Sequence, residues 1–157
     1  MKEPSFWYNH HNSLLSFILM PVGRVYGWIN AIRQEYINSW KAAIPIICVG
    51  NLVAGGQGKT PTAISIGSAL KACGKTIHFI SRGYGSTAKK LTLVDPTIHS
   101  AKEVGDEPLL LAQIAPTWIS ADRKMGVEAA YKSGADIIVM DDGFQNPSVI
   151  KDLNIIV

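Results

Sequence analysis

Residues 44–60 read IPIICVGNLVAGGQGKT, and this stretch decides the fold. Its first part, residues 44–49, is a short apolar run with β-branched side chains, which is typical of a buried strand. A glycine-rich segment follows, and from Lys59 the sequence predicts a helix that runs to about Cys73 and is closed by Gly74. A strand, a glycine-rich loop and a helix in this order are the context of a phosphate-binding loop.

The glycine-rich loop carries the residue types that hold phosphate groups. Glycines let successive backbone N–H groups face one anion, and the helix N-terminus adds its partial positive charge. Lys59 would reach the β- and γ-phosphates, and the Thr60 hydroxyl would bind Mg²⁺. Val53 stands where the strict pattern has glycine, so the match is a variant, and an ordinary glycine-rich turn is the alternative. The residues expected to bind nucleotide are Gly55, Gly56, Gln57, Gly58, Lys59 and Thr60.

Outward from this stretch, the chain alternates between strand and helix patterns. Apolar runs predict strands at residues 76–80, 91–94, 117–120 and 137–140, and residues 152–157 look like the start of another. Helix starts are predicted at Asp106, with Pro108 in the first turn, and after Asp122, where Gly134 ends the helix. Repeated strand–helix–strand units with apolar strands predict an α/β fold of the P-loop NTPase type, a parallel sheet covered by helices.

Two acidic residues follow the apolar strand predicted at residues 137–140. Asp141 and Asp142 would lie at the edge of a parallel sheet where ligands bind, close to the phosphate loop. A carboxylate there can hold Mg²⁺ directly or through water, together with Thr60. The alternative is that the paired acids merely cap a turn, with Gly143 supplying a positive φ.

Two further segments place polar residues beside predicted elements. The sequence SRGYG at residues 81–85 puts Arg82 and Tyr84 after a strand, where they suit an anionic or sugar ligand, although a solvated loop explains them equally well. The sequence GDEP at residues 105–108 puts Asp106 and Glu107 at a helix N-terminus, where capping alone is an equally good explanation.

Composition places the chain among globular proteins of about one domain. The 157 residues are 47% apolar and 17% charged, which excludes disorder as the main state. A net charge of +3 is too small to indicate a nucleic-acid partner. The two cysteines, Cys48 and Cys73, lack a CxxC partner, so we expect no zinc site and interpret both as small core residues.

The N-terminal residues 1–42 differ in composition from the rest. Apolar residues recur at three- and four-residue steps between Val22 and Tyr36, which predicts an amphipathic helix. Such an aromatic-rich, weakly basic helix can lie in a membrane interface, or it can pack on the domain that follows. The apolar run at residues 14–20 is too short to span a bilayer. The composition leaves both interpretations open, and it separates an N-terminal helical segment over residues 1–42 from a predicted nucleotide-binding domain over residues 43–157.

Taken in order, the motifs resemble the tetraacyldisaccharide 4′-kinase family over nearly the whole chain. They are VGNL at 49–52 running into GGQGKTP at 55–61, SRGYG at 81–85, GDEP at 105–108, DR at 122–123 and DDGFQ at 141–145. The resemblance implies that Pro61 joins the nucleotide-binding residues and that Asp106 is the general base, with Lys59 the other catalytic residue. It also implies that Asp141 and Asp142 associate with Mg²⁺, and that Arg82 and Tyr84 lie near the lipid substrate.

The resemblance implies transfer of the γ-phosphate of ATP to the 4′-hydroxyl of a tetraacylated glucosamine disaccharide phosphate, a step of lipid A biosynthesis. The reaction would take place at the cytoplasmic face of the bacterial inner membrane, and the N-terminal helix would associate with that membrane. Asn146 stands where the family usually has histidine.

Members of this family are much longer, and their second domain contributes a histidine that assists the general base. We therefore expect that the C-terminal part of the family fold is missing here and that this chain alone has little or no kinase activity. Two alternatives remain: another phosphate-loop ATPase or ligase, and a non-enzymatic module that binds ATP or a membrane. The deviant phosphate-loop ATPases carry a lysine near the start of the loop, where this chain has Val53 and Ala54.

Overall fold

The computed structural model describes residues 20–21, 23–25, 27–28, 39–51, 58–83, 90–144 and 146–157. The chain divides into two compact units, residues 1–38 and 39–157, and each is described by itself. In the first unit the described residues are helical and exposed, and the remainder of the predicted N-terminal helix lies outside them. Across the described ranges, no helix is long and apolar enough to cross a membrane.

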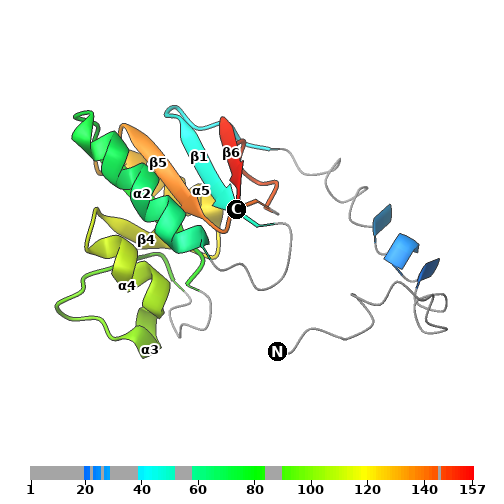
Figure 1. The fold of residues 1–157 in the computed structure, drawn as a ribbon, viewed down its shortest axis with the longest axis horizontal. Helices are drawn as coiled ribbons and strands as arrows, with labels where there is room; N and C mark the ends of the chain where they lie inside the picture. Colours follow the sequence, from blue (N-terminus) through cyan, green and yellow to red (C-terminus); the bar gives the residue numbers. More distant parts are fainter. Residues whose placement is uncertain are drawn as a thin grey trace. The chain divides into compact units, whose positions relative to one another are not determined.

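The second unit alternates strands and helices close to the predicted ranges (Figure 1). The described strands are β1 (Ile46–Gly50), β2 (Ile77–Ser81), β3 (Thr92–Leu93), β4 (Thr117–Ile119), β5 (Ile137–Asp141) and β6 (Leu153–Ile156). The helices are α2 (Lys59–Ala72), α3 (Ala101–Val104), α4 (Asp106–Ala112) and α5 (Arg123–Lys132). This order places a helix after β1, after β4 and between β3 and β4.

Within the described residues the strands form a six-stranded sheet in the order β3-β4-β2-β5-β1-β6. The predicted parallel pairing is confirmed for β4, β2, β5, β1 and β6, whereas β3 pairs antiparallel with β4. The edge strand β3 runs antiparallel because residues 82–91, which join β2 to β3, are fewer than the dozen or more that a parallel crossover connection needs. The chain therefore turns back along the sheet after β2.

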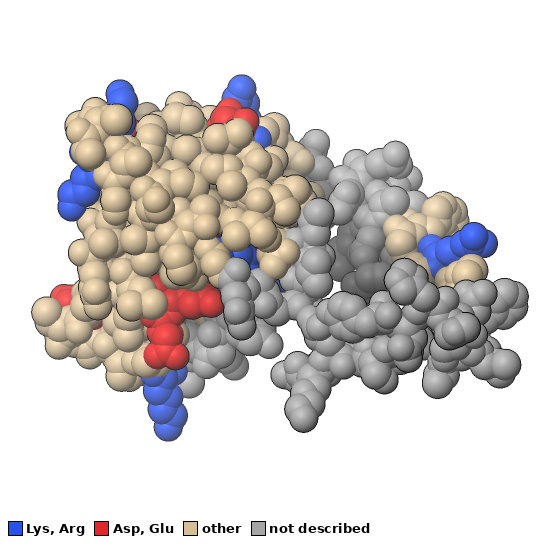
Figure 2. All heavy atoms as spheres, in the orientation of Figure 1, with Lys and Arg blue, Asp and Glu red and all other residues tan. Residues whose placement is uncertain are grey.

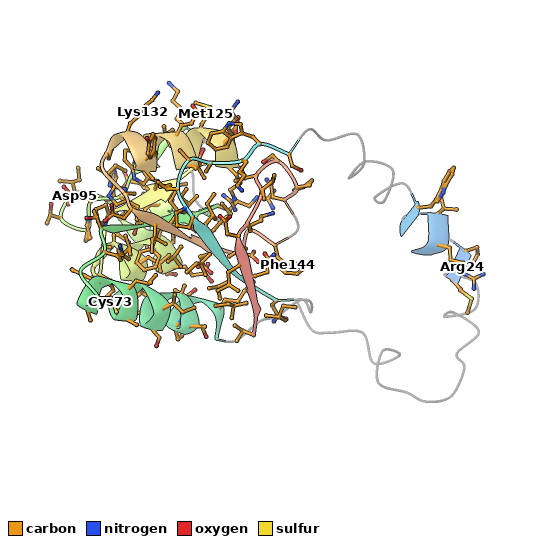
Figure 3. The ribbon with its side chains drawn as sticks, turned by 90° about the horizontal axis from the view of Figure 1, so that it is seen from above. Arg24, Cys73, Asp95, Met125, Lys132 and Phe144 are labelled. Atoms are coloured by element: carbon orange, nitrogen blue, oxygen red, sulfur yellow. The ribbon has the colours of Figure 1, made fainter. Side chains whose placement is uncertain are left out.

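Helices cover both faces of the sheet, as the sequence predicts. Figure 3 shows α5 on one side of the strands and α2 on the other. Side chains along a strand point alternately to the two helix layers. In β1, Ile46 and Cys48 belong to the hydrophobic cluster that contains Val127 of α5. Val49 belongs to the cluster that contains Ala63 of α2. Both layers pack on the same strands and so fix where the strand ends lie.

One local prediction needs correction, and one short helix was not predicted. Cys48 is buried in β1 as expected, but Cys73 is exposed, because it follows the last residue of α2 and extends beyond the region where that helix packs on the sheet. The short helix α3 was not predicted, although Ser100 and Glu103 form a capping box at its start.

Candidate functional site

The start of α2 positions the predicted lysine and threonine. Gly58 precedes the helix with a φ of 119°, a conformation that favours glycine. Lys59 and Thr60 are the first two residues of α2, Thr60 is buried, and Pro61 is exposed in the same turn, where its missing N–H is not needed. Three other residues predicted to bind nucleotide lie outside the described residues, namely Gly55, Gly56 and Gln57.

The acids that follow β5 lie against this helix start. Val49 of β1 pairs with Asp141 of β5, so the two strands end side by side. Lys59 Nζ lies 3.0 Å from Asp142 Oδ1, and Thr60 Oγ1 donates a hydrogen bond to Asp141 Oδ2 at 3.2 Å. The structure thus brings together the four side chains that the sequence assigns to phosphate and Mg²⁺.

The two acids differ in their exposure to solvent. Asp141 is 2% exposed, whereas the side chain of Asp142 is 56% exposed. Burial raises the pKa of Asp141 to about 6, and the negative charges of Glu107 and Asp142 add to this effect against the opposing hydrogen bond from Thr60. Asp141 Oδ1 is buried and has no hydrogen-bond partner among the described residues. An oxygen in this state is suited to a cation.

The first turn of α4 contributes a further acid that the sequence-based assignment missed. Asp106 and Glu107 are both exposed there, and the charge of Glu107 raises the pKa of Asp141, which indicates that this turn lies near the site. In Figure 2 acidic atoms gather over the region of α3 and α4. The predicted cap by Asp106 is wrong, because Gly105 occupies that position with a φ of 92°. The GDEP motif was the available signal for Glu107.

The segment after β2 is described in part. Arg82 is exposed, and Gly83 N donates a hydrogen bond to the Ser81 Oγ at 3.3 Å. Tyr84, which was predicted to lie near the substrate, is outside the described residues. The charge of Arg82 lowers the pKa of Arg123, which indicates that the segment after β2 lies near the start of α5.

Arg123 is a buried residue of this region that the sequence-based assignment also missed. It is 3% exposed and begins α5, which Asp122 caps as predicted. Its Nη1 donates to the Ser120 carbonyl oxygen at 2.7 Å and its Nη2 to the Asp142 carbonyl oxygen at 3.4 Å. Burial lowers the pKa of Arg123, and the like charge of Arg82 lowers it further. The DR motif at residues 122–123 was the available signal.

A largely parallel α/β sheet with Lys59 opening the helix after β1, and acids ending the adjacent β5, defines a protein of the phosphate-loop class. The family model described as tetraacyldisaccharide-1-P 4′-kinase matches residues 15–157. The chain belongs to this family, and the resemblance inferred from its motifs is confirmed.

Curated relatives carry the same name. The chain is 51% identical over 160 residues to the tetraacyldisaccharide 4′-kinase of Parvibaculum lavamentivorans, covering 100% of this chain and 47% of the relative. It is 48% identical over 162 residues to that of Rhodospirillum centenum, covering 100% of this chain and 48% of the relative. The chain therefore spans about half the length of these relatives.

A solved structure has the same fold. The crystal structure of LpxK from Aquifex aeolicus in complex with ATP matches with a TM-score of 0.78 and 32% sequence identity. The match covers 91% of this chain and 49% of that one. The predicted P-loop kinase-like α/β fold is confirmed.

Proposed function

We propose that this chain supplies the nucleotide-binding half of an ATP-dependent kinase that phosphorylates the 4′-hydroxyl of a tetraacyldisaccharide 1-phosphate. Membership of the family, the names of the curated relatives and the ATP named with the Aquifex aeolicus structure support this activity. The observation in this chain that carries the proposal is the pairing of Lys59 and Thr60 with Asp142 and Asp141 at one edge of the sheet.

Phosphoryl transfer depends mainly on positioning and on neutralising phosphate charge. Lys59 would exchange its contact with Asp142 for the β- and γ-phosphate oxygens of ATP. The N-terminus of α2 adds backbone N–H groups and a partial positive charge. The remaining residues of the loop would surround the phosphates, namely Gly55, Gly56, Gln57, Gly58 and Pro61.

The residues present fit Mg²⁺. This hard cation prefers oxygen ligands, and Asp141 offers a buried carboxylate oxygen with no hydrogen-bond partner among the described residues. Thr60, Asp141 and Asp142 would hold the ion, which when bound neutralises charge on the phosphates.

Asp106 would act as the general base on the acceptor hydroxyl. It would take the proton of the 4′-hydroxyl while that oxygen forms a bond to the γ-phosphorus, and the bond to the β–γ bridging oxygen breaks to release ADP. Arg82 and Tyr84 would contact the acylated glucosamine disaccharide phosphate, for which Arg82 supplies the charge that an anionic substrate requires.

The N-terminal segment, residues 1–42, would hold the nucleotide-binding domain, residues 43–157, at the cytoplasmic face of the bacterial inner membrane as a peripheral protein. Its aromatic and basic composition supports this arrangement. Binding to vesicles that contain anionic lipid, compared between the full chain and a variant with Trp28 and Arg24 replaced by serine, would test it. Equal binding by both would contradict this role.

Calorimetric titration with Mg·ATP tests the nucleotide site. We expect the chain to bind, and we expect Lys59→Met to weaken binding by at least about tenfold, because it removes a charged contact to the phosphates. Lys75→Met is the matched control, since this exposed lysine follows α2 at its far end. A wild-type chain that does not bind millimolar Mg·ATP would contradict the proposal.

Transfer of radiolabelled γ-phosphate to the disaccharide tests the reaction. We expect little or no turnover by the chain alone, because it spans about half of its relatives, and turnover when the C-terminal half of the Parvibaculum lavamentivorans relative is added. Binding of ATP without any transfer in that mixture would favour the non-enzymatic alternative. Hydrolysis of ATP that is independent of the disaccharide would favour another phosphate-loop ATPase.

A further inference from the structure

Asp142 has a left-handed backbone conformation, which is uncommon for residues other than glycine. Its φ is 56°, and among the described residues no other non-glycine residue has a positive φ. Aspartate enters this region more readily than most residues that have a Cβ, and the hydrogen bond from Asp142 N to the Val49 carbonyl oxygen helps to fix it there. In this conformation the carboxylate of Asp142 reaches Lys59 Nζ at 3.0 Å.

The backbone that follows β5 is packed closely against the sheet. We call it the site turn and define it by its described residues Asp142, Gly143, Phe144 and Asn146. Asp142 N donates to the Val49 carbonyl oxygen at 2.9 Å, and Asn146 N donates to the Gly143 carbonyl oxygen at 3.2 Å. A Cβ at Gly143 would overlap the side chain of Met140, so a larger residue there would require that side chain to move. These contacts leave the turn little freedom at its first residues.

Two cationic side chains bind carbonyl oxygens at opposite ends of the site turn. Arg123, anchored on the Ser120 carbonyl, donates to the carbonyl oxygen of Asp142, and Lys151 Nζ donates to that of Asn146. Among the described residues neither cation forms an ion pair with a carboxylate. Each therefore directs its charge at the main chain of the turn.

Both cations are held partly out of water. Arg123 is buried and Lys151 is half-buried, and burial lowers the pKa of each. The like charge of Arg123 also lowers the pKa of Lys151, which places the two side chains near one another. Holding two like charges in such a place is costly unless hydrogen bonds compensate for the lost water. The carbonyl oxygens of the site turn supply that compensation.

Asn146 is built into the turn. Its Oδ1 accepts hydrogen bonds from Ser148 N at 2.9 Å and from Ser148 Oγ at 2.6 Å. The side chain is therefore occupied within its own segment, while its main-chain carbonyl oxygen faces Lys151.

We propose that Arg123 and Lys151 are positioning residues of the ATP site, which hold two carbonyl oxygens of the site turn and so keep the carboxylate of Asp142 beside the start of α2, where it would help to hold Mg²⁺ once Lys59 contacts the phosphates. The inference rests on the proposed function in one respect, that Lys59 and Asp142 belong to the nucleotide site. Neither cation is placed against substrate, so both act through the backbone that carries Asp142.

Lys151→Met tests the contact between Lys151 and the Asn146 carbonyl oxygen and leaves the more deeply buried Arg123 unchanged. Methionine keeps much of the lysine stem and removes the donor and the charge. We expect the affinity for Mg·ATP to fall about tenfold, the size expected for loss of a charged hydrogen bond, and Lys151→Arg to restore most of it. Lys132→Met is the matched control, because Lys132 lies on the outer side of α5 (Figure 3) and should change affinity less than twofold.

A double-mutant cycle separates positioning from a general loss of structure. If Lys151 acts through Asp142, then Lys151→Met should weaken Mg·ATP binding about tenfold in the wild-type background and less than twofold when Asp142 is already asparagine. An equal loss in both backgrounds would show that Lys151 affects binding by another route and would overturn the proposal.

Amide hydrogen exchange tests, in the absence of nucleotide, whether Lys151 stabilises the site turn. Lys151→Met should speed exchange at the Asp142 amide at least about tenfold, whereas the Phe79 amide, which donates to the Pro116 carbonyl oxygen, should not change. If the wild-type chain fails to bind ATP, the proposed function fails while this measurement still decides the inference. Unchanged exchange at Asp142 would refute the role of Lys151 in holding the turn.

Discussion

Replacing Asp141 with asparagine should stabilise the folded chain at neutral pH, although it removes a residue of the candidate site. Burial raises the pKa of this carboxyl from 3.8 to about 6. The folded state therefore binds the proton more tightly than the unfolded state, and stability falls as pH rises from about 3.8 through about 6. Asparagine does not ionise, so the variant escapes this loss.

The size of the effect follows from the gap between the two pKa values. At about 1.4 kcal/mol for each pH unit, the gap corresponds to about 3 kcal/mol of unfolding free energy once Asp141 is fully ionised in both states. Asp141 is 2% exposed, so solvent screening takes little from this figure. The amide oxygen of asparagine can still accept the hydrogen bond that Thr60 donates at 3.2 Å.

Urea unfolding at 25 °C at pH 4.5 and pH 7.5 measures the effect. The gain in unfolding free energy of Asp141→Asn over the wild type should be about 2 kcal/mol larger at pH 7.5 than at pH 4.5. This comparison cancels changes in packing that do not depend on pH. It also cancels the titration of Asp95 and Glu103, because hydrogen bonds lower the pKa of these exposed carboxyls in both proteins.

Glu128→Gln is a suitable control, because it removes an exposed carboxylate whose pair with Lys124 spans 3.9 Å. A surface pair of this kind should change stability by less than about 0.5 kcal/mol. If the gain for Asp141→Asn is the same at both pH values, then Asp141 titrates as an ordinary carboxyl in the folded chain. The reasoning from its burial would then be wrong.

Three further predictions concern other titrating groups. Glu107→Gln should lower the pKa of Asp141, because the charge of Glu107 adds to the effect of burial. A carboxyl-carbon NMR titration would show the shift. An unchanged midpoint would mean that the charge of Glu107 does not affect the titration of Asp141. Burial lowers the pKa of His78 in the folded chain below its ordinary value of 6.5. The stability that the neutral imidazole contributes is therefore complete above pH 6.5 and is lost as the pH falls through the pKa of the folded state. His78→Phe should flatten the fall in unfolding free energy below pH 6.5. A thiol reagent should label Cys73 quickly and Cys48 only on unfolding, because Cys48 is buried and burial raises its pKa; two fast thiols in native protein would contradict this.

Local sequence signals predicted most of the fold. Asp122 caps α5 through its side chain, and the helix begins at Arg123 as the sequence indicates. The errors arise where tertiary geometry decides. The direction of β3 depends on the length of the connection from β2, and Cys73 is exposed because α2 ends one residue before it.

The candidate site was predictable where strand ends converge and unpredictable where a side chain crosses between elements. Parallel strands bring Asp141 beside the helix that starts at Lys59, so the pairing of acids with the loop followed from the order of elements alone. Arg123 reaches a carbonyl oxygen of Asp142 that is nineteen positions away in sequence. No spacing rule relates these residues, because their contact depends on how α5 packs against the end of β5.

The two contacts between the start of α2 and the acids differ in how readily a phosphate could replace them. The Lys59–Asp142 pair is the more exposed, with side chains 21% and 56% exposed, so water screens it and it contributes little to stability. Lys59 can therefore leave Asp142 for a phosphate oxygen at small cost. The Thr60–Asp141 hydrogen bond is buried, and Asp141 retains an oxygen without a partner among the described residues, so ionising that carboxyl is unfavourable until a cation arrives. Binding of Mg·ATP should therefore release a proton from Asp141 at pH values near 6, and calorimetry in buffers of different ionisation enthalpy would detect it. A binding enthalpy at pH 6 that does not depend on the buffer would contradict this coupling.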